Sequence, residues 1–181
     1  MGCKNKGLVN DLELNCEDIP VGGLTAVYLV RYSDAEGKLT VTDGVVTDST
    51  IAAGKIVKLD FNNKDGKTSF TDVKTVSETG VVKSIPTVII EFPKMTLAKR
   101  NAVEKITSPN TEYVAFVEEA TGVRHAIGMD FGVWGSGVEG ATGASKDDKN
   151  AYTLTLLGDE TNLSETINKA TWDKIVAALK P

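Results

Sequence analysis

The chain contains 181 residues, with 20 lysine and arginine residues against 25 aspartate and glutamate residues, so its formal net charge is −5. This length predicts a single domain whose core needs no disulfide or metal for its stability. The acidic balance argues against a protein that grips nucleic acid, because phosphate contacts need clustered lysine and arginine side chains. Cys3 and Cys16 are too few for a disulfide framework. No apolar run approaches the ~20 residues of a membrane-spanning helix, so no membrane anchor is predicted.

The chain is expected to begin with an arm and to continue in strands. Residues 1–23 are polar and rich in asparagine, aspartate and glycine, which predicts an extended N-terminal arm. Residues 25–32 are apolar at successive positions, a pattern typical of a strand that is covered on both faces. Within 38–50, the pair Asp43 and Gly44 indicates a tight hairpin turn between two strands.

The next three segments are also predicted to be strands. Residues 55–61 alternate between apolar and polar side chains, which places Val57 on the apolar face. Residues 68–77 favour a strand but are polar, so at least one face must meet water. Residues 81–92 form the strongest strand signal, and Pro86 within them predicts a bulge or an edge position, because proline cannot donate a ladder hydrogen bond.

Helix signals interrupt this pattern in the second half of the chain. Thr96 is a candidate N-cap for a helix that ends before Pro109. A hairpin follows, with strands at 113–117 and 124–131, and residues 132–149 are predicted to form a glycine-rich loop.

The last segments complete a β-rich chain. A final strand is expected at 151–157, and Thr171 is a candidate N-cap for a short C-terminal helix. The fold class is therefore all-β to β-rich α+β, a β-sandwich or barrel of seven to eight strands with one flanking helix and a short C-terminal helix. Residues 24–181 are predicted to form one domain that carries the loop at 132–149.

The residues that could carry chemistry do not form a catalytic constellation. Residues 135–140 match the pattern G-x-G-x-x-G, but a loop is expected after them, whereas a phosphate site needs a helix there. His125, the only histidine, is expected within a hairpin strand with no nucleophile motif nearby. Neighbouring acids such as Glu118 and Glu119 point to opposite faces of a strand. No catalytic, cofactor-binding or metal-binding residue is predicted, and the chain is not expected to be an enzyme.

Assembly explains these features better. Strands with polar faces and open edges are hazards in a monomer, and neighbouring copies can cover them. Trp134 lies among glycines, where an aromatic side chain can anchor an interface or fold back onto its own sheet.

The order of these segments resembles that of phage major tail proteins, which form the tail tube, and in particular those of phages that infect Bacteroides-like gut bacteria. The resemblance rests on the hairpin SFTDVKTVSETGVVKSIPTVIIEF, the helix LAKRNAVEKI, the hairpin YVAFVEEATGVRHAIGMDFG and the stretch GVWGSGVEGATGASKDDKNAYTLTLLGDE. It covers most of the chain, including the opening CKNKGLVNDLELNCEDIPVGGLTAVYLVRY.

The resemblance implies a structural virion protein that forms hexameric rings. The rings stack into a tube through which DNA leaves the capsid without specific binding, and other tail or neck proteins are further partners. The implied location is the virion tail, assembled in the cytoplasm of the bacterial host. The hairpin at 68–92, together with 113–131, is assigned to the inner barrel. The arm at 1–23 and the loop at 132–149 are assigned to contacts between subunits and rings.

Individual residues follow from these assignments. The expected interface residues come from the arm, the hairpin and the glycine-rich segment: Leu8, Leu12, Val82, Ile85, Trp134, Gly135, Gly137 and Gly140. The candidates for charges that face the lumen are Asp72, Lys74 and Glu78. Because Lys74 is a cation among acids, the charge of the lumen stays open at this point.

Two alternatives to the tail tube remain open. One is another virion protein with a similar sandwich, which would be a capsid decoration, head-completion or tail-terminator protein. The other is a carbohydrate- or host-binding β-sandwich module. An aromatic content of only 6% counts against this module, because such modules usually display aromatic platforms.

Overall fold

The computed structural model describes residues 22–61, 67–145 and 148–180, so the arm predicted at 1–23 lies outside the described residues except for its last two. The first half of this part contains β1 (Leu24–Arg31), α1 (Tyr32–Ala35), β2 (Leu39–Thr42), β3 (Val45–Ser49), β4 (Val57–Lys58), β5 (Ser69–Val76) and β6 (Val82–Pro93). The second half contains α2 (Leu97–Ile106), β7 (Tyr113–Glu119), β8 (Arg124–Ile127), β9 (Val133–Ala141), β10 (Ala151–Gly158), β11 (Glu165–Ile167) and α3 (Lys169–Ala177).

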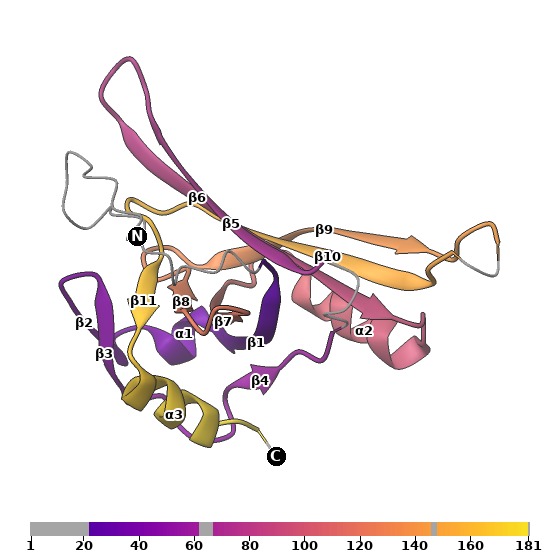
Figure 1. Ribbon diagram of the computed structural model, residues 1–181, viewed down its shortest axis with the longest axis horizontal. Coiled ribbons are helices and arrows are strands. Elements are labelled where there is room, and N and C mark those ends of the chain that lie inside the picture. The colour runs from indigo at the N-terminus through magenta and orange to yellow at the C-terminus, as the bar shows by residue number, and fades with distance from the viewer. Residues whose placement is uncertain (1–21, 62–66, 146–147, 181) are drawn as a thin grey trace, which may run out of the picture.

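The strands form one hydrogen-bonded sheet that folds into two layers (Figure 1). The first layer has the order β2-β3-β11-β8-β7-β1-β4, and the second has the order β9-β10-β6-β5. A single residue pair, Tyr113 with Val133, joins β7 to β9 and so connects the layers. The predicted β-rich α+β class is confirmed, but the described residues contain eleven strands rather than seven or eight. Of the strands that were not predicted, β11 has only three residues, too few to show a period, and β9 contains three glycines among its nine residues.

The main core lies between the two layers. Buried side chains of β1, β7 and β8 face those of β6, β9 and β10, and Val103 of α2 closes one end. Val88, Ile90, Leu154 and Leu156 have no exposed surface there. Their alternation with half-exposed residues along β6 and β10 is the period of a strand that is buried on one face.

A second apolar cluster lies on the other face of the first layer. Here Tyr28 and Val30 of β1 pack with Trp172 and Ile175 of α3. The rings of Tyr28 and Trp172 meet edge to face, with centroids 5.2 Å apart. The prediction that 25–32 forms a strand covered on both faces is therefore confirmed, although the strand ends at Arg31.

The structure contains the hairpins that the turn residues predicted. Asp43 and Gly44 connect β2 to β3 with φ values of 51° and 75°, as a two-residue hairpin turn requires. The predicted hairpin at 68–92 is formed by β5 and β6, which pair from Ser69 with Ile89 to Val76 with Val82. The last residue of β6 that pairs with β10 is Thr87. Pro86 lies directly beyond this pair, so it is partly at an edge, as predicted.

Two local predictions are wrong. Residues 133–141 form strand β9 rather than a loop, because the glycines pair with β10 along its whole length. Helix α3 is capped by Asn168, whose Oδ1 accepts from the backbone N–H of Thr171 at 2.8 Å, and Thr171 itself is inside the helix. Val57 is 45% exposed, whereas Leu59 is buried. The N-cap at Thr96 is confirmed by its hydrogen bond from the Lys99 N–H.

Gly128 and Gly132 bend the chain between the layers and end β8 earlier than predicted. Both have positive φ, at 84° and 81°. A Cβ on Gly128 would lie 2.8 Å from the Tyr113 oxygen and from the Val133 nitrogen, so only glycine fits beside the pair that joins the layers.

Candidate assembly surface

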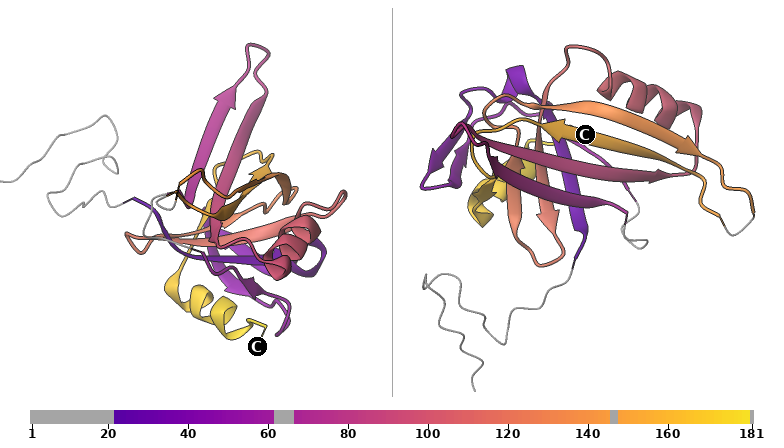
Figure 2. Two further views of the ribbon diagram at one scale, coloured as in Figure 1. Left: turned by 90° about the vertical axis from the view of Figure 1, so that its right-hand side faces the viewer. Right: turned by 90° about the horizontal axis from the view of Figure 1, so that it is seen from above.

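The β5–β6 hairpin extends beyond the rest of the molecule (Figures 1 and 2). Its outer end carries valines that contact little of their own chain. Val76 is 68% exposed, Val81 is 63% exposed and Val73 is 54% exposed. Exposed apolar side chains at the end of a projecting hairpin are typical of a protein–protein contact.

The second layer has an open edge on each side. β5 is the last strand of the sheet and pairs only with β6 among the described strands. At the other side, β9 pairs with β10, and only its first residue, Val133, pairs with β7. From Trp134 to Ala141, β9 therefore has no strand partner on its outer side within the described residues. Open edges of this length can pair with another chain.

Threonine and serine dominate the face of the second layer that points away from the core. The pairing register places on this face Lys83, Ile85, Thr87, Ile89 and Glu91 of β6 and the residues that lie opposite them. The hydroxyl-bearing residues that share it are Ser69, Thr71, Thr75, Thr87, Thr153 and Thr155. Val73, Ile85, Ile89 and Leu157 share the face with these hydroxyl groups, so the surface is mostly uncharged and mixes polar and apolar side chains.

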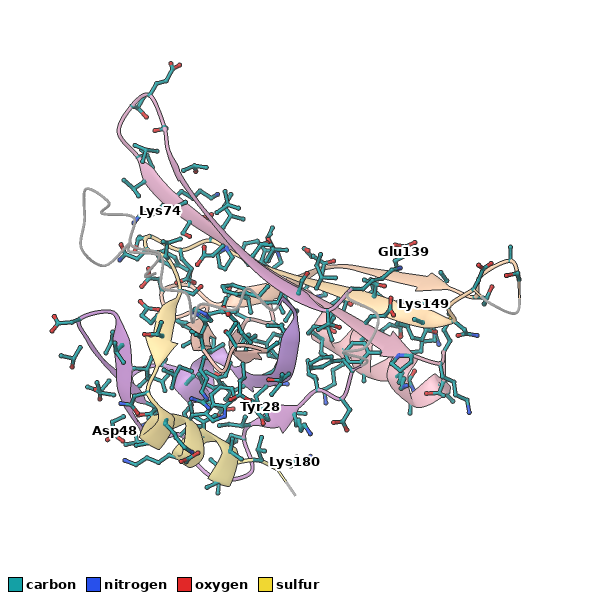
Figure 3. The ribbon with its side chains drawn as sticks, viewed as in Figure 1. Tyr28, Asp48, Lys74, Glu139, Lys149 and Lys180 are labelled. Atoms are coloured by element: carbon teal, nitrogen blue, oxygen red, sulfur yellow. The ribbon has the colours of Figure 1, made fainter. Side chains whose placement is uncertain are left out.

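The carboxylate of Glu91 on this face is neutralised by its neighbours. Glu91 is only 2% exposed, and its Oε1 lies 3.2 Å from Lys149 Nζ while its Oε2 lies 3.5 Å from Lys67 Nζ. Its backbone N–H also donates to the Thr68 hydroxyl at 3.2 Å. Lys149 is labelled in Figure 3. Lys83 is likewise paired, with Asp159 at 2.8 Å.

Side chains at the base of the hairpin tie it to the chain that follows β10. Asp72 of β5 accepts from the Ser84 hydroxyl and, at 2.7 Å, from the backbone N–H of Ser164. The backbones of Ser84 and Glu160 exchange two hydrogen bonds, at 2.7 and 2.8 Å. The hairpin therefore leaves the body in a fixed direction even though its end is exposed.

Glu160 is a buried acid at this base. It is 6% exposed, its Oε2 accepts from the Asp130 N–H at 2.8 Å, and its Oε1 has no hydrogen-bond partner in the described part of the chain. Burial raises the pKa of Glu160 to about 7, although backbone hydrogen bonds from Asp130 and Phe131 oppose the rise. The carboxylates of Asp130 and Glu165 raise it further. Near neutral pH this site thus holds a carboxyl group that is readily protonated.

The structure divides the predicted interface residues between two places. Trp134 (37% exposed) and the glycines at 135, 137 and 140 lie together on β9, at one open edge. Val82 and Ile85 lie on β6, at the hairpin. Leu8 and Leu12 fall outside the described residues.

The predicted lumen residues do not share the threonine-rich face. Asp72 and Lys74 lie opposite Pro86 and Ser84, whose side chains point to the core side of β6. Lys74 (Figure 3) has its Nζ 3.5 Å from Asn162 Oδ1. Glu78 lies in the turn between β5 and β6 and is exposed. The sequence did not reveal Thr71, Thr87, Thr153 and Thr155 as one surface, because only the register between strands brings them together.

The other residues considered for chemistry have structural surroundings. His125 lies in β8 with its Nε2 2.8 Å from Glu119 Oε1 and its ring 5.3 Å from that of Phe70. Glu118 pairs with Arg124 at 2.8 Å. The G-x-G-x-x-G motif is part of β9, which no helix follows directly, so it lacks the geometry of a phosphate loop. Among the described residues, no group of three or more histidine, cysteine, aspartate or glutamate side chains could hold a metal ion.

Comparison of the chain with protein-family models, with curated proteins and with solved structures finds no match. In the described ranges, no helix is long and apolar enough to cross a membrane.

Proposed function

We propose that this protein is a structural virion protein, a subunit of a phage tail tube that assembles into stacked hexameric rings and forms a conduit for DNA. One observation carries the proposal: the four-stranded layer β9-β10-β6-β5 has an open edge on both sides and ends in a projecting hairpin with exposed valines. The family resemblance in the order of the segments supports the same role.

The two open edges are suited to closing a ring. Successive strands of the layer are antiparallel, so β5 and β9 run in opposite directions. In a ring with cyclic symmetry, β9 of one copy would therefore lie antiparallel to β5 of the next, and the alternation would continue around the ring. Such a head-to-tail contact closes when the rotation per copy permits, and closure removes both open edges of this layer.

The threonine-rich face would line the channel of this ring. Its hydroxyl groups are polar but carry no charge, and the nearby Glu91 and Lys83 are already paired. DNA phosphates would find no cluster of unpaired lysine or arginine on it, so this surface would let DNA pass rather than bind it. The proposed location is the virion tail, where the rings would also meet other tail or neck proteins.

Electron microscopy of the purified protein tests the proposal, and Lys74 offers a sharp variant. The Ser77 N–H donates to the Val81 oxygen and so points toward β6. Successive N–H groups of a strand point to opposite sides, so the Lys74 N–H points away from β6, to the open edge of β5. We expect rings or tubes with a central hole from the wild type. Lys74→Pro should abolish them, because it removes an outward donor while sparing the hairpin bonds.

Lys74→Ala is the matched control, since it removes the same charge but keeps the N–H, and it should still form rings. Circular dichroism should show that both variants remain folded. A wild type that shows no ring under any assembly condition, or a folded Lys74→Pro variant that still forms rings, would contradict the proposed strand pairing. Binding to capsids instead would support a decoration protein.

A further inference from the structure

A groove of about 440 Å³ opens between α2, β4 and the C-terminal residues. Its floor is apolar and consists of Leu29, Val57, Leu59, Ile106 and Tyr113. Leu29, Leu59 and Tyr113 belong to the main core, so the groove reaches the core from outside. Its size is within the range of pockets that take up ligands or side chains of a partner.

The rim of the groove is basic, which is unusual in a chain of net charge −5. It carries Arg31, Lys55, Lys105 and Lys180 against a single carboxylate, Asp34. Lys55 pairs with Asp34 at 3.1 Å. Within the described residues, the other three cations form no ion pair. Lys180 (Figure 3) is held beside the groove by the hydrogen bond of its backbone N–H to Ile56, at 2.8 Å.

One wall of the groove is formed by the short strand β4. β4 pairs with β1 through Val57 and Lys58, and on its other side Ile56, directly before β4, bridges Leu179. Val57 is 45% exposed there. An apolar floor and a basic rim together suit an extended segment that carries apolar and acidic side chains.

Residues 8–19 of this chain have that composition. The segment LVNDLELNCEDI contains five aliphatic residues and four acids and has no lysine or arginine. In Asp11-Leu12-Glu13-Leu14 the two kinds alternate, so an extended backbone would direct the leucines to one side and the acids to the other. The leucines match the floor and the acids match the rim.

The direction of β1 favours a segment from another copy. The groove is lined by Leu29 and Arg31, near the end of β1, whereas the arm joins β1 at Leu24. The Gly23 oxygen accepts from the Ala120 N–H at 3.0 Å. Followed backwards from Leu24, the chain therefore continues beside the residues that follow β7, and this direction leads away from the groove. We infer that this groove binds residues 8–19 of a neighbouring copy, an inference that rests on the proposed assembly into rings.

Disulfide cross-linking of full-length chains tests the inference. Cys3 and Cys16 are first replaced by serine. One population then carries Leu12→Cys and the other carries Val57→Cys. After mixing and mild oxidation, we expect a disulfide-linked dimer, which can arise only between copies. A partner population with Thr121→Cys, at an exposed turn outside the groove, should give little dimer.

Charge reversal at the rim gives a second measurement. Lys105→Glu in the Val57→Cys chain should lower the initial rate of cross-linking about tenfold, equal to about 1.4 kcal/mol. Glu13→Lys in the Leu12→Cys chain should restore the rate. Lys38→Glu, the same change at an exposed lysine that does not line the groove, should leave the rate unchanged.

Two results would overturn the inference. One is a dimer yield no greater than that of the Thr121→Cys control. The other is a fast-migrating monomer from a chain that carries both Leu12→Cys and Val57→Cys, which would mean that each arm occupies its own groove. If rings form under the microscope but either result is obtained, the groove assignment fails while the proposed tube subunit stands. Absence of rings would instead count against the proposed function.

Discussion

At the scale of residues, a few polar side chains decide how the exposed hairpin is held. Asp72 accepts two hydrogen bonds that join β5 to Ser84 and to Ser164, and Glu160 lies buried beside them. A buried polar group without its partner costs stability, so such contacts fix one arrangement over others. The direction of the hairpin therefore depends on the contacts of acidic side chains, and one of these acids, Glu160, has a raised pKa.

Stability should fall as pH rises between about 4.5 and about 7 because of Glu160. Its pKa is raised from 4.5 to about 7, so in this window the folded protein keeps a proton that the unfolded chain has released. Each pKa unit corresponds to about 1.36 kcal/mol, which gives a loss of up to about 3 kcal/mol. Glu160→Gln cannot ionise, and urea denaturation at pH 4.5 and pH 8 should show a smaller loss in this variant.

The neighbouring acid provides the control for this measurement. Asp159 is about half exposed and pairs with Lys83, so Asp159→Asn should leave the pH dependence of the free energy of unfolding close to that of the wild type. A pH-dependent loss in Glu160→Gln as large as in the wild type would show that other acids cause it. Glu165 is one such acid, since burial raises its pKa as well.

At the scale of elements, β9 shows how a strand can be built from a sequence that predicts a loop. Three of its nine residues are glycines. They differ in their surroundings: a Cβ on Gly135 would lie 2.6 Å from Thr107 Cγ2 and 2.9 Å from Thr107 Cα, whereas Gly137 has open space. Gly135 lets the strand approach the end of α2, and this approach positions Trp134 at the open edge.

These two glycines should respond in opposite ways to alanine. Gly135→Ala should lower the free energy of unfolding by about 1–3 kcal/mol, because the backbone of Thr107 cannot move aside without shifting α2. Gly137→Ala should raise it by about 0.5–1 kcal/mol, because glycine loses more conformational entropy in a strand than alanine. Chemical denaturation of both variants measures the difference, and equal effects would contradict the close packing at Thr107.

The sequence predicted the elements that have a local signal and missed those that depend on pairing. The hairpin at Asp43 and Gly44, the N-cap at Thr96 and the β5–β6 hairpin follow from turn chemistry, capping and alternation. β9 is absent from that prediction because glycine carries no strand propensity and β10 supplies its hydrogen bonds. The threonine-rich face was missed for a related reason, since its members come from three strands whose register no local pattern contains.

At the scale of the whole molecule, β1 and β7 connect two apolar clusters. Val27 and Leu29 of β1 face the main core between the layers, whereas Tyr28 and Val30 face the cluster under α3. β7 alternates in the same way. Because the two clusters share these strands, neither can lose its packing without exposing the other, and the molecule should unfold as one unit.

The two tryptophans allow this cooperativity to be measured, because each reports one side of the molecule. Trp134 lies on β9 of the second layer, and Trp172 lies in the cluster under α3. Single-tryptophan chains are made with Trp172→Phe or Trp134→Phe.

Ile175→Ala, at a fully buried position beside Trp172, should lower the free energy of unfolding by about 2–5 kcal/mol in both chains. Val176→Ala, at an exposed position on α3, should change it by less than about 0.5 kcal/mol. If Ile175→Ala shifted the denaturation midpoint of Trp172 but left that of Trp134 unchanged, the layers would be separate folding units, and β1 and β7 would not couple the α3 side to the layer with the hairpin.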